Sequence, residues 1–169
     1  MRLLKFIILL VMFMKMSATT LNAQVDTLFW FAAPWVTPDH NGNTPLAFRV
    51  STFNNAATVR MQLPTGTFDT TFIVPANSLG NVDLSYIVND LESKPADAIL
   101  TSGLKITSDE MITVVYDFIS MSPSNPETYS LKGQNGMGIE FVVPFQTLWN
   151  NRTLGGASPL QPKQFFSVV

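Results

Sequence analysis

The sequence predicts an all-β protein, an antiparallel β-sandwich with one short helix. Two observations support this fold class. Apolar residues alternate with polar residues at a period of two along most of the chain. The segments between these alternating stretches are rich in Gly, Pro, Asn and Asp, which are typical of turns. Short strands separated by turns at this spacing favour two packed antiparallel sheets.

The first segment, residues 1–23, is predicted to be a secretory signal peptide and is excluded from the fold. Arg2 and Lys5 precede the uncharged apolar run Phe6–Met14, and small polar residues lead to Ala23. A retained membrane anchor is the alternative, but a spanning helix needs about twenty apolar residues and this run is shorter. We therefore expect cleavage after Ala23, no membrane insertion of the mature chain, and a secreted or cell-surface location.

Ten segments then follow the strand pattern. They are residues 27–33, 46–53, 57–63, 70–74, 80–84, 103–108, 111–120, 128–133, 139–145 and 165–169. The single helical candidate is residues 85–93, where Ser85 can cap the helix and Lys94-Pro95 can end it.

Residues 46–53 illustrate how the alternation assigns faces. Phe48 and Val50 fall on one side, expected to be the core, and Arg49 falls on the other. The short connection of residues 54–56 suggests a hairpin with the strand 57–63. This hairpin would place Arg49 and Arg60 on the solvent faces of neighbouring strands, where we expect both to be solvated.

Charge and cysteine content narrow the classes of partner and chemistry. Three of the ten basic residues lie in the signal segment, and all twelve acidic residues follow it, so residues 24–169 carry a net charge of −5. A mildly acidic chain without a basic stripe argues against nucleic acid and anionic membranes as partners. The absence of cysteine excludes disulfides, zinc-thiolate sites and cysteine nucleophiles. Residues 24–169 have the length of one domain.

Residues 131–151 combine glycines with a lysine, which allows more than one interpretation. A phosphate loop would require a helix after the glycines and Ser or Thr after the lysine, whereas Lys132 precedes a glycine and a strand-like segment. We expect instead that Gly133, Gly136 and Gly138 permit positive φ in a tight connection.

The end of this stretch contains the candidate ligand-binding residues. Aromatic faces and amide groups are the side chains that recognise sugars, and such groups follow the predicted strand in a loop. Trp35, after the first strand, adds aromatic surface. The candidate residues are Trp35, Gln146, Trp149, Asn150 and Asn151.

The sequence contains few residues that are suited to catalysis. His40 is the only histidine, and no nucleophile elbow accompanies it. Asp109 and Glu110 have turn composition, while Asp117 and Glu140 lie in strand-like segments, and Asp117 could be buried there. We predict no catalytic residues and no cofactor.

A calcium site is the one metal site that the sequence allows. Asp39, Asn41 and Asn43 bear oxygens at alternate positions of residues 38–43. The same residues are typical of a turn, and the loop lacks the bidentate glutamate of an EF-hand. No metal ligand is therefore predicted.

Several motifs, taken in order, resemble the amino-terminal domain of the IgG Fc-binding protein family. They are FWFAAPWV (29–36), TPLAFRVST (44–52), IVPANS (73–78), KPADAILTSGLKITSDEMITVVYDF (94–118) and YSLKGQNGMGIEFVVPFQTLWNN (129–151). The resemblance covers residues 26–169. In place of Trp35 the family usually has an acidic residue.

The resemblance implies the kind of larger protein in which this domain occurs. Domains of this family are common in large surface proteins of gliding-type bacteria, ahead of adhesion repeats and a carboxy-terminal sorting domain. The family domain continues past residues 165–169 into a further hairpin, which implies that the β-sandwich domain of residues 24–169 is truncated at its carboxy-terminal end. The resemblance brings no catalytic residues, and immunoglobulin binding is not carried over.

Together these observations predict a non-catalytic secreted or cell-surface binding and adhesion module, the amino-terminal part of a larger surface protein. Its expected partners are an extracellular protein or glycan and the downstream domains of the same polypeptide. The alternative is a carbohydrate-binding or degenerate carbohydrate-active domain.

Overall fold

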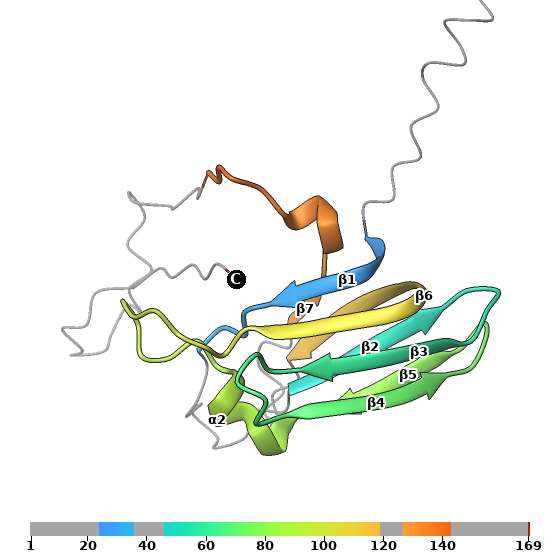
Figure 1. The fold of residues 1–169 in the computed structure, drawn as a ribbon, viewed down its shortest axis with the longest axis horizontal. Coiled ribbons are helices and arrows are strands. Elements are labelled where there is room, and N and C mark those ends of the chain that lie inside the picture. The colour runs from blue at the N-terminus through green and yellow to red at the C-terminus, as the bar shows by residue number, and fades with distance from the viewer. Residues whose placement is uncertain (1–23, 36–45, 119–126, 143–168) are drawn as a thin grey trace, which may run out of the picture.

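The fold is all-β and antiparallel with one short helix, as predicted (Figure 1). The computed structural model describes residues 24–35, 46–118, 127–142 and 169. The elements are β1 (Val25–Phe31), β2 (Leu46–Thr52), β3 (Ala57–Gln62), β4 (Asp69–Val74), β5 (Leu79–Asp83), the 3₁₀ turn η1 (Ser85–Ile87), helix α2 (Val88–Leu91), β6 (Leu104–Phe118), β7 (Glu127–Ser130) and the 3₁₀ turn η2 (Gly133–Gly136). None of the described helices has the length and apolar character needed to cross a membrane.

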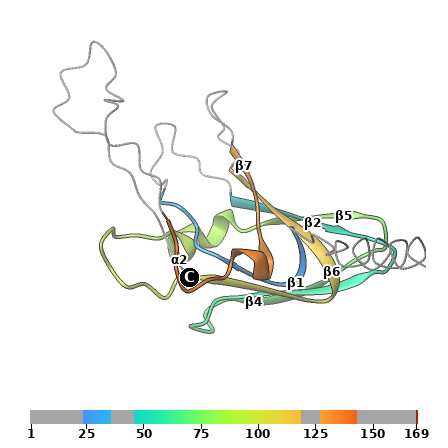
Figure 2. The same cartoon turned by 90° about the horizontal axis from the view of Figure 1, so that it is seen from above.

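The long strand β6 organises the sheet, whose order is β4-β3-β6-β2-β5. The first part of β6 pairs with β3 on one edge and β1 on the other. The second part pairs with β2 and β7. Figures 1 and 2 show that β6 curves from one layer into the other, so that β3 and β4 lie over β2 and β5. The sheet therefore folds back on itself as a two-layered sandwich.

The curvature of β6 coincides with an irregularity in its pairing with β1. Leu28 pairs with Thr107 and Asp26 with Ile112, so residues 108–111 lie opposite the single residue Thr27. We expected two strands separated by a turn at Asp109-Glu110, and the structure corrects this to one bulged strand. The Asp109 carboxylate accepts a hydrogen bond from the Thr58 amide at 2.7 Å, which ties the bulge to β3 and lowers the pKa of Asp109.

The expected hairpin between residues 46–53 and 57–63 does not form. β2 pairs with β5 and β6, while β3 pairs with β4 and β6. The two strands lie end to end along the same edge of β6, and the intervening residues cross from one layer to the other. This arrangement turns the apolar stripes of β2 and β3 toward the shared interior, which a flat hairpin would not achieve.

The predicted facing of the strands is confirmed. Phe48 and Val50 of β2 and Met61 of β3 are fully buried, whereas Arg49 and Arg60 point outward. Phe31, Phe48 and Tyr116 join the layers, with ring centroids 4.7–5.6 Å apart. Full burial of one large apolar side chain contributes about 1.5–3 kcal/mol, so this shared core is the main source of stability.

The helical segment is shorter than predicted and begins differently. Instead of a helix over residues 85–93 there is one 3₁₀ turn followed by one α-helical turn, and of the apolar face only Leu91 is fully buried. Ser85 does not cap it. Its hydroxyl accepts a hydrogen bond from the Leu46 amide at 2.9 Å, which fastens the segment to the start of β2.

Two further predictions concern segments at the end of the chain. Ile139–Val142, expected to begin a strand, belongs to no strand of the described sheet, and its side chains are exposed. Of the predicted strand 165–169 only Val169 is described, and it lies beside Gly103, where an added Cβ would come within 2.6 Å of its Cγ1. The predicted signal peptide, residues 1–23, lies outside the described residues.

Candidate functional site

Of the ligand-binding residues predicted from sequence, the structure describes only Trp35. It follows β1 and its side chain is 49% exposed. Gln146, Trp149, Asn150 and Asn151 lie outside the described residues, as do His40 and the calcium alternative at Asp39, Asn41 and Asn43. In the part of the chain that is described, no three acidic, histidine or cysteine side chains are grouped as a metal site would require.

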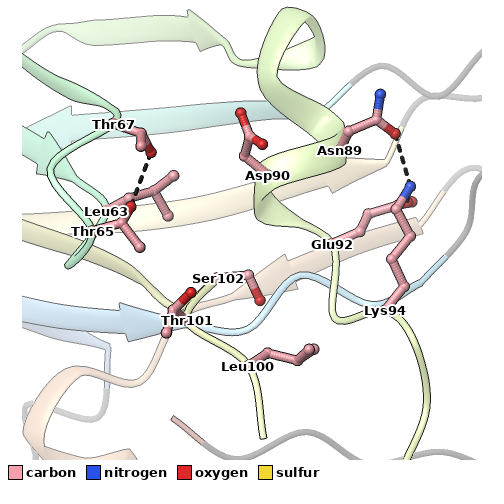
Figure 3. A pocket seen from close by; sticks show the side chains of 10 residues that line it. All are labelled: Leu63, Thr65, Thr67, Asn89, Asp90, Glu92, Lys94, Leu100, Thr101 and Ser102. Atoms are coloured by element: carbon pink, nitrogen blue, oxygen red, sulfur yellow. Dashed lines mark hydrogen bonds and ion pairs between the residues drawn. The ribbon is translucent and has the colours of Figure 1, made fainter. Parts of the chain in front are cut away.

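The described surface contains an open hollow of about 260 Å³ at one end of the sandwich (Figure 3). Three connections build it: the turn between β3 and β4, helix α2 with the residues after it, and the segment that leads into β6. The lining residues are Leu63, Thr65, Thr67, Asn89, Asp90, Glu92, Lys94, Leu100, Thr101 and Ser102. Most of these side chains are polar, and several carry hydroxyl groups.

The turn between β3 and β4 forms one wall. It is closed by hydrogen bonds from the Leu63 amide to the Phe68 carbonyl and from the Gly66 amide to the Leu63 carbonyl, both at 2.9 Å. Gly66 has φ +75°, a conformation that favours glycine. The hydroxyls of Thr65 and Thr67 lie 2.9 Å apart above this turn. The closed turn therefore presents a pair of hydroxyls at the rim.

The opposite wall rests on a buried ion pair. Glu92 is 1% exposed, and its Oε2 accepts a hydrogen bond from Lys94 Nζ at 2.9 Å. The backbone of Glu92 bridges to Ala33, and the next amide, that of Ser93, donates to the Ala33 carbonyl at 2.9 Å. Because both its side chain and its backbone are held, this wall is anchored to the end of β1.

Lys94 also sets the orientation of a neighbouring amide group. Its Nζ donates to Asn89 Oδ1 at 2.8 Å, which leaves the Asn89 NH₂ directed away from the lysine (Figure 3). Asp90, the next residue of α2, extends toward the β3–β4 turn. Within the described part of the chain no hydrogen bond or ion pair engages its carboxylate. An amide donor and a carboxylate acceptor thus project from opposite sides of α2 (Figure 3).

An aromatic ring stands beside the same wall. Tyr86 is 73% exposed and precedes Asn89 by one helical turn. Its ring packs edge-on against Phe68, with centroids 6.5 Å apart, and Phe68 directly follows Thr67 of the opposite wall. Trp35 lies at the same end of the sandwich, two residues after Ala33, which bridges to Glu92.

No residue of the hollow was a candidate on sequence grounds. The hollow could have been predicted from the alternating direction of successive antiparallel strands. Because β6 turns back between its pairing with β3 and its pairing with β2, β3 and β5 run toward the same end of the sandwich, and the connections that follow them meet there (Figure 1). The connection after β3 contains two threonines, and the connection after β5 contains Ser, Asn and Asp.

The glycine-rich segment that suggested a phosphate loop has a different role. Gly133 has φ +56°, as predicted, but Gly136 and Gly138 do not have positive φ. The amide of Gln134 donates to Asp26 Oδ2 at 2.7 Å, and its side-chain Nε2 donates to Oδ1 at 3.3 Å. The donors of this loop therefore bind a carboxylate of the chain itself, which fastens η2 to β1.

Asp26 is correspondingly perturbed. Burial by itself would raise the pKa of this carboxyl, but hydrogen bonds from the backbone of Gln134, Thr27 and Leu28 and from the Gln134 side chain outweigh that effect. The net result is a pKa below the ordinary value of 3.8. Asp26 is thus held ionised as a structural anchor.

The two arginines expected to be solvated are ion-paired. Arg49 Nε faces Oδ2 of Asp117, a carboxylate that is 4% exposed and also accepts a hydrogen bond from the Thr128 hydroxyl at 3.0 Å. The Arg49 contact is an ion pair without the alignment of a hydrogen bond. Arg60 binds Asp69 through both its Nε, at 2.8 Å, and its NH2. The register of β2 and β6 explains the first pair, because it places Asp117 next to the strand of Arg49.

Comparison with known proteins found no matching family model, no matching curated protein and no matching solved structure. The resemblance to the amino-terminal domain of the IgG Fc-binding protein family, drawn from the ordered motifs, stays a prediction. The function of this chain is therefore argued from the geometry of its described residues.

Proposed function

We propose that this chain is a non-catalytic binding and adhesion module of a secreted or cell-surface protein, and that the hollow is its ligand site. The observation that carries the proposal is the convergence of three connections, distant in sequence, on one hollow with polar groups at its rim. Loops at the end of a rigid β-sandwich are the usual place for binding residues, because the strands fix their position.

The rigidity of the walls supports a binding role. The Lys94 ammonium holds both Asn89 and the buried Glu92, and the β3–β4 turn is closed by two backbone hydrogen bonds. A site whose side chains are already ordered loses less conformational entropy when a ligand binds. The rim groups that this network leaves available, above all the carboxylate of Asp90, can then be used for recognition.

The context of the proposal comes from the sequence. The charged start and apolar run of residues 1–23 support export. The ordered motifs support a place in a larger surface protein, whose downstream domains would be intramolecular partners. The external partner is an extracellular protein or glycan.

The test uses the full chain, expressed in a secreting bacterial host and screened against arrays of glycans and extracellular proteins. Thr65→Trp places a bulky side chain at the rim of the hollow, and Thr71→Trp, on the outward face of β4, is the matched control. The hollow variant should weaken binding by about tenfold or more through steric clash, and the control should not. Equal binding by both variants would exclude the hollow, and a protein that binds neither array would contradict the binding role.

A further inference from the structure

We infer that the hollow accepts one hexose ring of a neutral glycan, with Asp90 accepting hydrogen bonds from two adjacent sugar hydroxyls. This inference rests on the proposed function and adds the class of ligand. The size of the hollow and the charge and hydrogen-bonding groups of its lining residues support it.

The size of the hollow limits the ligand. Its volume of about 260 Å³ lies below the range of roughly 300–1,000 Å³ that is typical of sites for drug-sized ligands. A volume of this size holds one small ring. Because the hollow is open to solvent, the ring can belong to a longer chain that leaves through the mouth.

The charge of the lining selects against anions. Asp90 and Glu92 are acidic, and Lys94 is the one basic group among the lining residues, so the hollow carries a net charge of −1. The single ammonium group is occupied by the Glu92 carboxylate and the Asn89 carbonyl. Phosphate, sulfate and carboxylate groups would therefore meet repulsion without a compensating cation. A ligand with uncharged hydroxyls meets no such repulsion.

The remaining chemistry matches a polyhydroxylated ring. The side chains of Thr65, Thr67, Thr101 and Ser102 contribute hydroxyls, each able to donate and accept, as sugar hydroxyls do. Leu63 and Leu100 provide apolar surface for the C–H groups of the ring. A carboxylate accepts two hydrogen bonds from adjacent hydroxyls, and bonds to an ionised acceptor are the stronger kind.

The orientation of the Asn89 amide is fixed before any ligand binds. Lys94 holds the Asn89 carbonyl, so the amide can offer only its NH₂ to a ligand. Asp90 is adjacent on the same helical turn and has no partner among the described residues. The exposed ring of Tyr86, one turn earlier, offers an apolar face against which a sugar can pack.

The experiment is a two-dimensional amide NMR titration of the isotope-labelled, exported full chain. The probes are methyl α-D-mannopyranoside, methyl β-D-glucopyranoside and methyl β-D-galactopyranoside, each at up to about 50 mM, which detects dissociation constants in the millimolar range. At least one probe should produce saturable shifts confined to amides of the three connections that build the hollow. Asp90→Asn should weaken this binding by about tenfold, since a charged acceptor is replaced by a neutral one.

The control is Asp97→Asn, in the same loop region but outside the hollow. Asp97 is exposed and has φ +58°, which asparagine tolerates, so its spectrum and its affinity should be unchanged. Tyr86→Ala should also weaken binding, and Tyr86→Phe should retain it. Preserved spectral dispersion in each variant separates loss of binding from loss of fold.

Two outcomes overturn the inference. The first is that no probe shifts the amides of the hollow, and the second is that the Asp90 and Asp97 variants bind equally. The saccharide class fails while the proposed function stands if Thr65→Trp abolishes binding of an arrayed protein and the methyl glycosides have no effect. Both fail if neither the arrays nor the titrations detect a ligand.

Discussion

Replacing Gly133 with alanine should destabilise the protein through two separable effects. The first is conformational, because Gly133 has φ +56°, and a left-handed conformation costs a residue with a Cβ about 1–2 kcal/mol. The second is steric. An added Cβ would lie 2.5 Å from Asp26 Cβ and 2.6 Å from Asp26 Oδ2, closer than side chains can approach.

The steric effect must displace a hydrogen-bonded carboxylate. Asp26 Oδ2 accepts the Gln134 amide at 2.7 Å, and a hydrogen bond to a charged group contributes about 1.5–3 kcal/mol. Summing the two effects gives an expected loss of about 2.5–5 kcal/mol. Since small domains are stable by only about 5–15 kcal/mol, the change should be readily measured by urea unfolding.

Gly66 provides a matched control. It also has positive φ, at +75°, but no atom lies within 4 Å of the position that its Cβ would occupy. Gly66→Ala should therefore show the conformational cost alone, about 1–2 kcal/mol. Equal losses for the two variants would refute the steric argument. In addition, Asp26→Ala should relieve the clash, so the cost of Gly133→Ala should be smaller in that background than alone.

Three other predictions follow from the same structure. The folded-state pKa of Asp26 lies below its ordinary value of 3.8, so the contribution of Asp26 to stability is complete above that value and is lost as the pH falls through the lowered pKa. In urea unfolding at acidic pH, Asp26→Asn should flatten this part of the plot of unfolding free energy against pH. An unchanged slope would contradict the anchor role. Val50→Asp should cost several kcal/mol of unfolding free energy by placing a charge in the core. Arg49→Asp should also destabilise the protein, by roughly 1–3 kcal/mol, because it places a like charge beside the buried Asp117. A loss below about 0.5 kcal/mol for Arg49→Asp, as expected of ordinary surface positions, would show that the Arg49 ion pair contributes nothing to stability. Intact-mass analysis of exported protein should find cleavage after Ala23, and recovery of the full chain in the membrane would contradict the signal peptide.

The local pattern of the sequence predicts which side of each strand is buried. Val50 and Met61 are core residues because side chains alternate along any strand, whatever its partner. The partner itself is decided elsewhere. A short connection suggests that β2 and β3 form a hairpin, yet both pair with β6, which begins at Leu104. Local turn length carries no information about so distant a strand.

Turn composition is ambiguous in a similar way. Asp109-Glu110 has the residues of a turn, but bulges use the same residues, and only the pairing with β1 distinguishes the two.

Gly133 shows both what can and what cannot be predicted from the sequence. Its positive φ was predictable from composition, whereas its contact with Asp26 joins parts of the chain more than a hundred residues apart.

The hollow was missed for a topological reason. Each of its three connections contains ordinary polar turn residues, and none is distinctive alone. The hollow exists only because antiparallel strands bring these connections to the same end of the sandwich. Its key side chains, Asn89 and Asp90, lie in the one helical turn, where the sequence pattern indicates only which side packs inward.

The central strand β6 also determines when the sandwich can become stable as the chain is synthesised. β2 can pair with β5, and β3 with β4, but no strand pairs with a member of both sets until β6 has emerged as far as Phe118. Pairings between such distant segments form slowly, because closing a long loop of chain precedes the contacts that stabilise it. A nascent chain built in this order stays unfolded for most of its synthesis, which is the state that threading through a translocation pore requires if the chain is exported as proposed.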